Sequence, residues 1–326
     1  MTKVSGNTEL SGFRLFWSRF NERGVLLVLI GLCIILSIVT PNFRQVTNVI
    51  NITRQIAEIS IAAIGMTYVI IVAEIDLSIG SVYGLCAMIA GKMLGRNISI
   101  PLVIIMAIAV GAAIGLFNGA ITTKLKVPAF IVTLSVLALA RGAVMFLAEG
   151  YSLSVFPTSA NPFFAIGGNI GRIPIQIFIM FVLLTIAGII LAKTTFGFKI
   201  YATGGNKVAA QLTGINTDRI KIYCFMICGA TAAISGIISL AYLQSVHPSA
   251  GTGREMDVIA AVIVGGTYLY GGRGTILGTF IGAAIIGVVR NGMVLIGIPA
   301  YGQEAFIGFV ILIAVILDTL LRREKQ

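Results

Sequence analysis

The stretch FIMFVLLTIAGIILA, Phe178–Ala192, is apolar at every position except Thr185. A transmembrane barrel strand alternates apolar and polar residues with a period of two, and this stretch does not. By contrast, about 20 apolar residues in a helix, rising about 1.5 Å per residue, cross a hydrocarbon core about 30 Å thick. The stretch therefore predicts a membrane-spanning helix and an all-α membrane protein.

The rest of the chain has the same character. Of its 326 residues, 57% are hydrophobic and 11% are charged, whereas a soluble domain has about 25% charged residues. The mean hydropathy is +1.01. Apolar runs predict about ten transmembrane helices in a single permease-like domain covering residues 1–326; the runs 78–95 and 256–270 are the weakest, because they are short and rich in Gly or Ser. The predicted spans lie near 24–40, 56–73, 78–95, 99–122, 127–147, 173–192, 220–243, 256–270, 275–298 and 304–321.

The net charge of +11 fits a membrane orientation better than a nucleic-acid partner, because Lys and Arg accumulate in cytoplasmic loops. With the N-terminal segment 1–23 inside, ten spans also place the loop 193–219 and the tail 322–326 in the cytoplasm, and the loop 149–172 outside. Both termini are then cytoplasmic. This arrangement puts 15 of the 23 basic residues inside: Lys3, Arg14, Arg19, Arg23, Lys124, Lys126, Lys193, Lys199, Lys207, Arg219, Lys221, Arg273, Arg322, Arg323 and Lys325.

Motifs for catalysis are missing from the sequence. It contains no G-x-x-x-x-G-K-[ST] phosphate loop and no G-x-S-x-G nucleophile motif, and His247 is its one histidine. The four cysteines lie in apolar spans and are expected to be small core residues. We therefore expect no enzymatic activity, no metal site and no cofactor bound by this chain.

Two segments predict close helix packing and an internal repeat. GAAIGLFNG (111–119) and GTILGTFIG (274–282) each carry three glycines four residues apart, a pattern that lets helix backbones approach closely in membranes. The glycines are Gly111, Gly115, Gly119, Gly274, Gly278 and Gly282. GAAI recurs at 111–114 and 282–285, and PA at 128–129 and 299–300, each 171 residues apart. Since the copies would cross the membrane in opposite directions, we expect an inverted repeat, as in many transporters; chance recurrence in a Gly-Ala-Ile-rich chain is the alternative.

Polar residues at membrane depth concentrate in AEIDLSIGS (73–81). Ionisable residues inside a membrane mark a pathway or a paired structural site, and Asp76 followed by Ser78 also fits a helix start capped by a side-chain oxygen. We interpret 74–81 as a break between two spans, with either a capping role or a pathway or gating role. The candidate pathway residues are Tyr68, Glu74, Asp76, Ser78 and Ser81; Tyr68 could stack on a sugar ring or simply pack. Five further ionisable residues, expected near interfaces or paired between helices, are Glu58, Arg141, Arg290, Glu304 and Asp318.

The predicted cytoplasmic loop contains YATGGNKVAAQLTGINTDRIKI (201–222), longer than a simple connection needs. A turn at Gly204-Gly205-Asn206, followed by a short helix that ends at Gly214, would form a protrusion in which Ala209 and Ala210 allow close approach. Such a helix can dock on another protein or lie on lipid headgroups. The candidate docking residues are Gly204, Gly205, Asn206, Ala209, Ala210 and Gly214.

Three stretches together resemble the permease subunits of ribose-type ATP-binding-cassette importers: GMTYVIIVAEIDLSIGS (65–81), YATGGNKVAAQLTGINTDRIKI (201–222) and GREMDVIAAVIVGGTYLYGGRGTILGTFIGAAIIGVVRNG (253–292). The resemblance extends from about Gly24 to Leu321. It implies an ABC importer permease fold of about ten helices that imports ribose, galactose, xylose or a similar ligand across the bacterial inner membrane. Ala73-Glu74 departs from the small or Gly residues that many relatives have there.

The same resemblance implies the partners. Two permease subunits, either two copies or one copy and a close relative, would stand at the centre of the complex. Residues 204–215 would be the coupling segment that fits a cleft in a cytoplasmic ABC ATPase, which binds the ATP and Mg, and a periplasmic binding protein would deliver the ligand. Two alternatives stay open: a proton-coupled secondary sugar transporter with Glu74 and Asp76 as proton carriers, and a permease for branched-chain amino acids.

Overall fold

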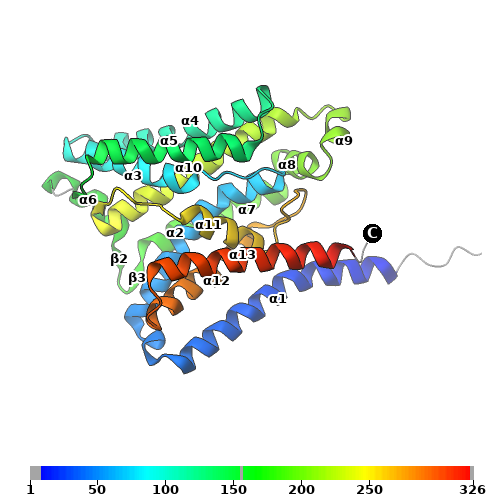
Figure 1. The fold of residues 1–326 in the computed structure, drawn as a ribbon, viewed down its shortest axis with the longest axis horizontal. Coiled ribbons are helices and arrows are strands. Elements are labelled where there is room, and N and C mark those ends of the chain that lie inside the picture. The colour runs from blue at the N-terminus through cyan, green and yellow to red at the C-terminus, as the bar shows by residue number, and fades with distance from the viewer. Residues whose placement is uncertain (1–8, 155–156, 324–326) are drawn as a thin grey trace, which may run out of the picture.

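The computed structural model describes residues 9–154 and 157–323, which form a bundle of helices with two small strand pairs (Figure 1). The longer helices are α1 (Glu9–Val39), α2 (Val46–Ile71), α3 (Ile79–Gly95), α4 (Ile100–Lys124), α5 (Ala129–Ala148), α7 (Ile175–Lys193), α8 (Thr195–Gly205), α10 (Thr217–Leu243), α11 (Arg254–Val264), α12 (Ile276–Leu295) and α13 (Ala300–Arg323). Shorter elements are η1 (Pro41–Arg44), η2 (Thr158–Ala160), α6 (Asn161–Phe164), η3 (Ala165–Gly167) and α9 (Lys207–Leu212). The strands β1 (Leu153–Ser154) and β4 (Ser245–Val246) pair antiparallel, as do β2 (Asn169–Ile170) and β3 (Ile173–Pro174).

The predicted spans each coincide with a helix, but not all of these helices are long. Within the described residues, α2, α4, α5, α7, α10 and α12 are long and apolar enough to cross a membrane, and α1, α3 and α13 contribute shorter apolar stretches. The prediction of a span over 256–270 is corrected, because α11 ends at Val264. The amide of Thr267 donates to the carbonyl of Val262 and Gly266 has φ +88°, a glycine-dependent helix end. An 11-residue helix rises only about 16 Å, about half a bilayer core.

The two ends of the bundle carry different segments (Figure 1). The helices α8 and α9 lie at the same end as the C-terminal end of α13, while α6, β2 and β3 lie at the opposite end. The predicted loop 149–172 contains only short elements in its described part and forms no span. Residues 1–8 of the N-terminal segment and 324–326 of the tail lie outside the described residues.

The inverted repeat is present in the helices. The helices α2 and α10 begin at residues 46 and 217, α4 and α12 end at 124 and 295, and α5 and α13 begin at 129 and 300; each pair is 171 residues apart. Ala73 and Gln244, also 171 apart, both take positive φ after α2 and α10. In addition, α4 packs on α10 and α12 packs on α2, so the third helix of each repeat contacts the first helix of the other. The repeats α2–α5 and α10–α13 are therefore interlocked.

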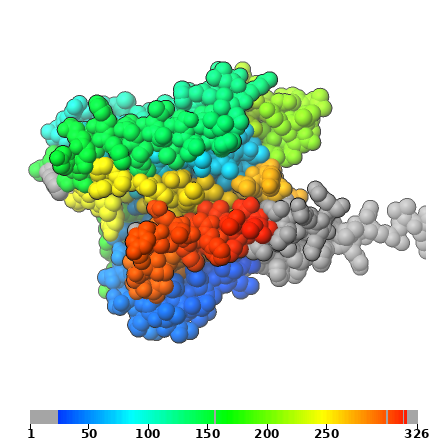
Figure 2. All heavy atoms as spheres, viewed as in Figure 1, coloured from blue at the N-terminus to red at the C-terminus, as the bar shows by residue number. Residues whose placement is uncertain are grey.

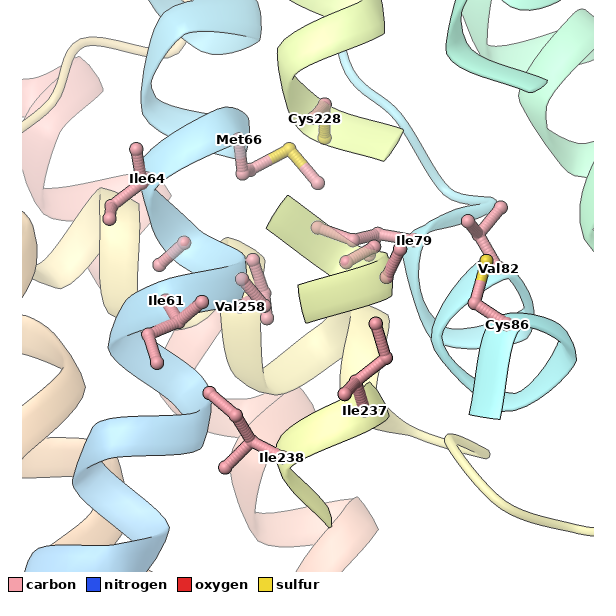
Figure 3. Close-up of a cluster of buried hydrophobic side chains, with 14 of the residues drawn as sticks. Ile61, Ile64, Met66, Ile79, Val82, Cys86, Cys228, Ile237, Ile238 and Val258 are labelled. Atoms are coloured by element: carbon pink, nitrogen blue, oxygen red, sulfur yellow. The ribbon is translucent and has the colours of Figure 1, made fainter. Parts of the chain in front are cut away.

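The core forms where the first helices of the two repeats pack together (Figure 3). Ile61, Ile64 and Met66 of α2 point toward Ile237 and Ile238 of α10, and all five are buried. Ile79, Val82 and Cys86 of α3 and Val258 of α11 complete the cluster. Cys224 and Cys228 are also fully buried, as expected of packing residues, while Cys33 is partly exposed.

The two glycine patterns lie at close backbone contacts. A methyl group at Gly111 would overlap the carbonyl oxygen of Gly229 on α10, and one at Gly115 would overlap that of Phe225. On α12, a methyl group at Gly278 would overlap the carbonyl oxygen of Gly265 at the end of α11. Small residues thus let α4 approach α10, and α12 approach α11, to backbone distance.

Candidate functional site

The predicted docking segment consists of two helices and a left-handed turn. The prediction of a turn at Gly204-Gly205 is corrected, because both residues still belong to α8 and the chain turns at Asn206. The side chain of Asn206 accepts a hydrogen bond of 3.0 Å from the amide of Ala209 and caps α9. Gly214 then takes φ +83°, which ends the segment as predicted. The side chain of Asn216 caps α10 in the same way.

The exposed surface of α9 is apolar. Val208 is 66% exposed and Leu212 is 84% exposed, and they lie four residues apart on the same face of the helix. Ala209 is exposed as well, whereas Ala210 is only 4% exposed and faces the protein's own interior. The sequence analysis placed Ala210 among the docking residues and omitted Val208 and Leu212; an apolar pair at that spacing was the available signal.

The base of this segment is locked to the end of α2. Gly204 lies so close to the carbonyl oxygen of Ile71 that a methyl group at Gly204 would overlap it. The same carbonyl accepts a hydrogen bond of 2.8 Å from the amide of Gly272, in the segment 265–275 between α11 and α12. The hydroxyl of Tyr201 donates to the carbonyl of Gly274 over 2.7 Å. Three segments distant in sequence therefore meet at one carbonyl group.

The segment 72–78 between α2 and α3 is the predicted break, and its polar groups are paired within the protein. Glu74 forms an ion pair with Lys221 at the start of α10. Asp76 is 1% exposed, and one of its carboxylate oxygens accepts from the amide of Ser78 at 2.9 Å and from its hydroxyl at 2.6 Å. The amide group of Asn118 donates to the Ser78 hydroxyl at 3.0 Å. These contacts shape a turn before α3.

The remaining pathway candidates are buried in the packing. Tyr68 is buried, and its hydroxyl donates to the carbonyl of Ala187 on α7 over 2.7 Å. Ser81 is also buried, and its hydroxyl has no hydrogen-bond partner among the described residues. In this conformation, neither residue faces an open passage.

The ionisable residues at membrane depth are mostly paired between helices. Glu58 on α2 pairs with Arg254 on α11, and Arg290 on α12 donates to Asp257 over 2.7 Å. The guanidinium group of Arg254 also lies over the ring of Tyr83, 5.2 Å from its centre. These contacts hold the short helix α11 against α2, α3 and α12. The side chain of Asp318 lies outside those that the structure describes.

Arg141 on α5 is bonded differently. Its guanidinium group donates to the carbonyl of Ala250 over 2.7 Å and interacts electrostatically with Glu255. Within the described residues, no group of three His, Cys, Asp or Glu side chains is arranged to hold a metal ion.

Comparisons with known proteins agree along the whole chain. Residues 48–315 match the family model described as the permease component of branched-chain amino acid transport systems. The ribose import permease protein RbsC of Haemophilus influenzae is 41% identical over 319 residues, which cover 97% of this chain and 98% of that protein. RbsC of Bacillus subtilis is 39% identical over 305 residues, covering 90% and 92%.

A solved structure has a related fold. It is described as an inward-facing conformation of a metal-chelate type ABC transporter and matches with a TM-score of 0.50 and 15% identity, covering 93% of this chain and 98% of that one. At this identity the match bears on the fold alone.

Proposed function

The chain belongs to the ABC-importer permease family whose model describes the permease component of branched-chain amino acid transport systems, and we propose that it is the membrane-spanning subunit of an ATP-driven importer of ribose or a similar small sugar. The observation that carries the sugar assignment is the 41% identity to a ribose import permease over 97% of the chain. The ligand's exact identity is set largely by a separate binding protein.

Transport assays test the substrate class directly. The permease is expressed with its ATPase and binding protein in cells that lack other ribose uptake, and entry of labelled ribose is measured. We expect uptake that stops when ATP is depleted and survives a protonophore. Excess xylose or galactose would compete if the ligand is a related sugar. Competition by leucine in place of sugars would favour the branched-chain amino acid alternative, and loss of uptake with the protonophore alone would favour a proton-coupled carrier.

The helix α9 is the contact for a cytoplasmic ABC ATPase. Two features support this role: its exposed apolar pair, Val208 and Leu212, and its position at the same end of the bundle as the C-terminus (Figure 1). Apolar side chains anchored on a short capped helix fit a cleft on a partner protein, because burying them is favourable. ATP and Mg belong to that partner.

Movement of α9 reaches the spans through the junction at Ile71. Since Gly204 and Gly272 both contact this carbonyl, a shift of α8 displaces the end of α2, the segment 72–78 and the segment 265–275 together. An ATP-driven change can bias the permease only through contacts that differ between two states. This junction is the contact inside the chain through which the bias acts.

The complete importer contains further parts. A second permease subunit, identical or closely related, forms the passage with this one, and a periplasmic binding protein delivers the sugar to the end that carries α6, β2 and β3. Both termini lie in the cytoplasm of a bacterial inner membrane. The positive-inside distribution of Lys and Arg supports this orientation.

A further inference from the structure

The two repeats touch each other at one pair of glycines. A methyl group at Gly80 would overlap the carbonyl oxygen of Gly251, and a methyl group at Gly251 would overlap the carbonyl oxygen of Gly80. The two residues are 171 positions apart, the same offset that relates the helices of the two repeats. The contact is therefore reciprocal, and it lies on the pseudo-two-fold axis of the molecule.

The same hydrogen-bonded turn precedes this contact in both repeats. In the first, a carboxylate oxygen of Asp76 accepts from the amide and the hydroxyl of Ser78. In the second, Nδ1 of His247 accepts from the amide of Ser249 at 3.2 Å and lies 2.7 Å from its hydroxyl. His247 and Ser249 are each 171 residues after Asp76 and Ser78. Different side chains thus build equivalent turns before the short helices α3 and α11.

These turns bring broken helices to the interior of the membrane from opposite sides. The segment 72–78 follows the end of α2 near α8, whereas 244–253 follows the end of α10 at the opposite end of the bundle. In transporters with inverted repeats, substrates bind near the bilayer midplane, where discontinuous helices of the two repeats meet. The surroundings of Gly80 and Gly251 are accordingly where a ligand in transit would be contacted.

Two side chains beside this contact have unused hydrogen-bonding capacity. Glu255 lies next to Gly80, and its Oε2 is buried with no hydrogen-bond partner among the described residues. Arg141 lies twelve residues from the start of α5 and seven from its end, well inside the span, and is half-buried. It spends one donor on Ala250 and interacts electrostatically with Glu255. A guanidinium group has five N–H donors, so donors remain.

This location faces the outside of the subunit. Figure 2 shows the part of the chain around α11, in yellow and orange, as a strip between α5 and α13. Met256, the neighbour of Glu255, is 47% exposed, and Glu304 of α13 lies beside Gly253. A molecule passing along this strip would meet Arg141 and Glu255 together.

The pairing of charges selects the chemistry of the ligand. The guanidinium group repels a cation, the two carboxylates repel an anion, and together they offer strong donors and strong acceptors. A hydroxyl group is both a donor and an acceptor, so a neutral polyhydroxylated ring satisfies both partners. We propose that Arg141 and Glu255 form a transient hydroxyl-binding site for the transported sugar at the interface of the two repeats. This inference rests on the proposed sugar-import function.

Reconstituted importer, with its ATPase and binding protein, tests the site. Glu255→Ala and Arg141→Ala are compared with Ser135→Ala, which alters an exposed hydroxyl on the same helix α5. The readouts are ribose transported per ATP hydrolysed and ATPase stimulation by the ribose-loaded binding protein. We expect the two site variants to lower ribose per ATP about tenfold, as for loss of one charge-assisted hydrogen bond, while ATPase stimulation persists. Ser135→Ala and the conservative Glu255→Gln should stay closer to wild type.

A labelling measurement covers the case in which these variants fail to assemble. In a Cys33→Ala background, Met256→Cys reacts with a charged thiol reagent, and ribose should slow that reaction while a sugar that the importer does not carry should not. Unchanged ribose per ATP in both alanine variants, or equal labelling with and without ribose, overturns the site. Absence of ribose uptake by the wild-type complex would instead overturn the proposed function.

Discussion

The amide of Gly272 donates a hydrogen bond of 2.8 Å to the carbonyl of Ile71, residues that lie 201 positions apart (272 minus 71). This bond ties the segment before α12 to the end of α2, and Gly204 packs against the same carbonyl group. The proposed route from α9 to the spans depends on this junction, and the predictions below begin there.

Gly204→Ala should uncouple the importer, and Gly205→Ala should not. A methyl group at Gly204 would overlap backbone atoms, whereas at Gly205 its closest neighbour is 4.0 Å away. Overpacking at a tight backbone contact costs about 1–3 kcal/mol, enough to displace α8. Ribose uptake and ATPase binding are measured at equal permease levels in the membrane. Equal behaviour of the two variants would show that this contact does not carry the coupling.

Leu212→Glu should weaken ATPase binding while leaving the permease inserted and folded. Leu212 is 84% exposed, so the substitution disturbs no internal packing but removes an apolar anchor worth about 1.5–3 kcal/mol when buried. The ATPase that copurifies with the permease in detergent is quantified, with Thr213→Ala as the control on the same segment.

Cross-linking provides an independent check of the same surface. A cysteine at Leu212 should cross-link to the ATPase, and a cysteine at Ala210 should react poorly because that position is 4% exposed. Labelling of the Leu212 cysteine only by an impermeant reagent added from outside the cell would contradict both the orientation and the docking role.

Asp76→Ala should destabilise the permease more than Ser81→Ala. The substitution at Asp76 removes the acceptor of two hydrogen bonds from Ser78, each worth about 1.5–3 kcal/mol to a charged group. The Ser81 hydroxyl has no partner among the described residues, so its removal should cost little. Detergent-solubilised protein is heated, and the fraction that remains monodisperse is measured. Indistinguishable melting of the two variants would show that the turn at Asp76 is dispensable.

Gly278→Leu should abolish folding or assembly, whereas Gly31→Leu should be tolerated. The side chain at Gly278 would collide with the carbonyl oxygen of Gly265, while the position at Gly31 on α1 has no atom within 4 Å. A close helix contact built for glycine cannot admit a branched side chain. Membrane abundance and complex size in detergent are compared, and normal values for Gly278→Leu would mean that the glycine pattern is incidental.

The sequence alone determined the membrane-spanning segments and the repeat. In lipid, each span must satisfy its own backbone hydrogen bonds, so helix formation depends on local apolar length and is legible in the chain. The recurrence of GAAI and PA at an offset of 171 predicted the relation between α4 and α12 and between α5 and α13 for the same reason. The short helix α9 and its end at Gly214 follow from local capping and turn chemistry.

Only the tertiary structure decided which polar groups meet. Asp76 and Tyr68 look like pathway residues in the sequence, yet packing buries both and gives each a partner inside the protein. The meeting of Arg141 with Glu255, and of Gly204 with Ile71, joins residues more than a hundred positions apart. Such contacts depend on how helices are rotated and offset against one another. That arrangement is set by packing of small residues across the whole bundle, which no local stretch of sequence encodes.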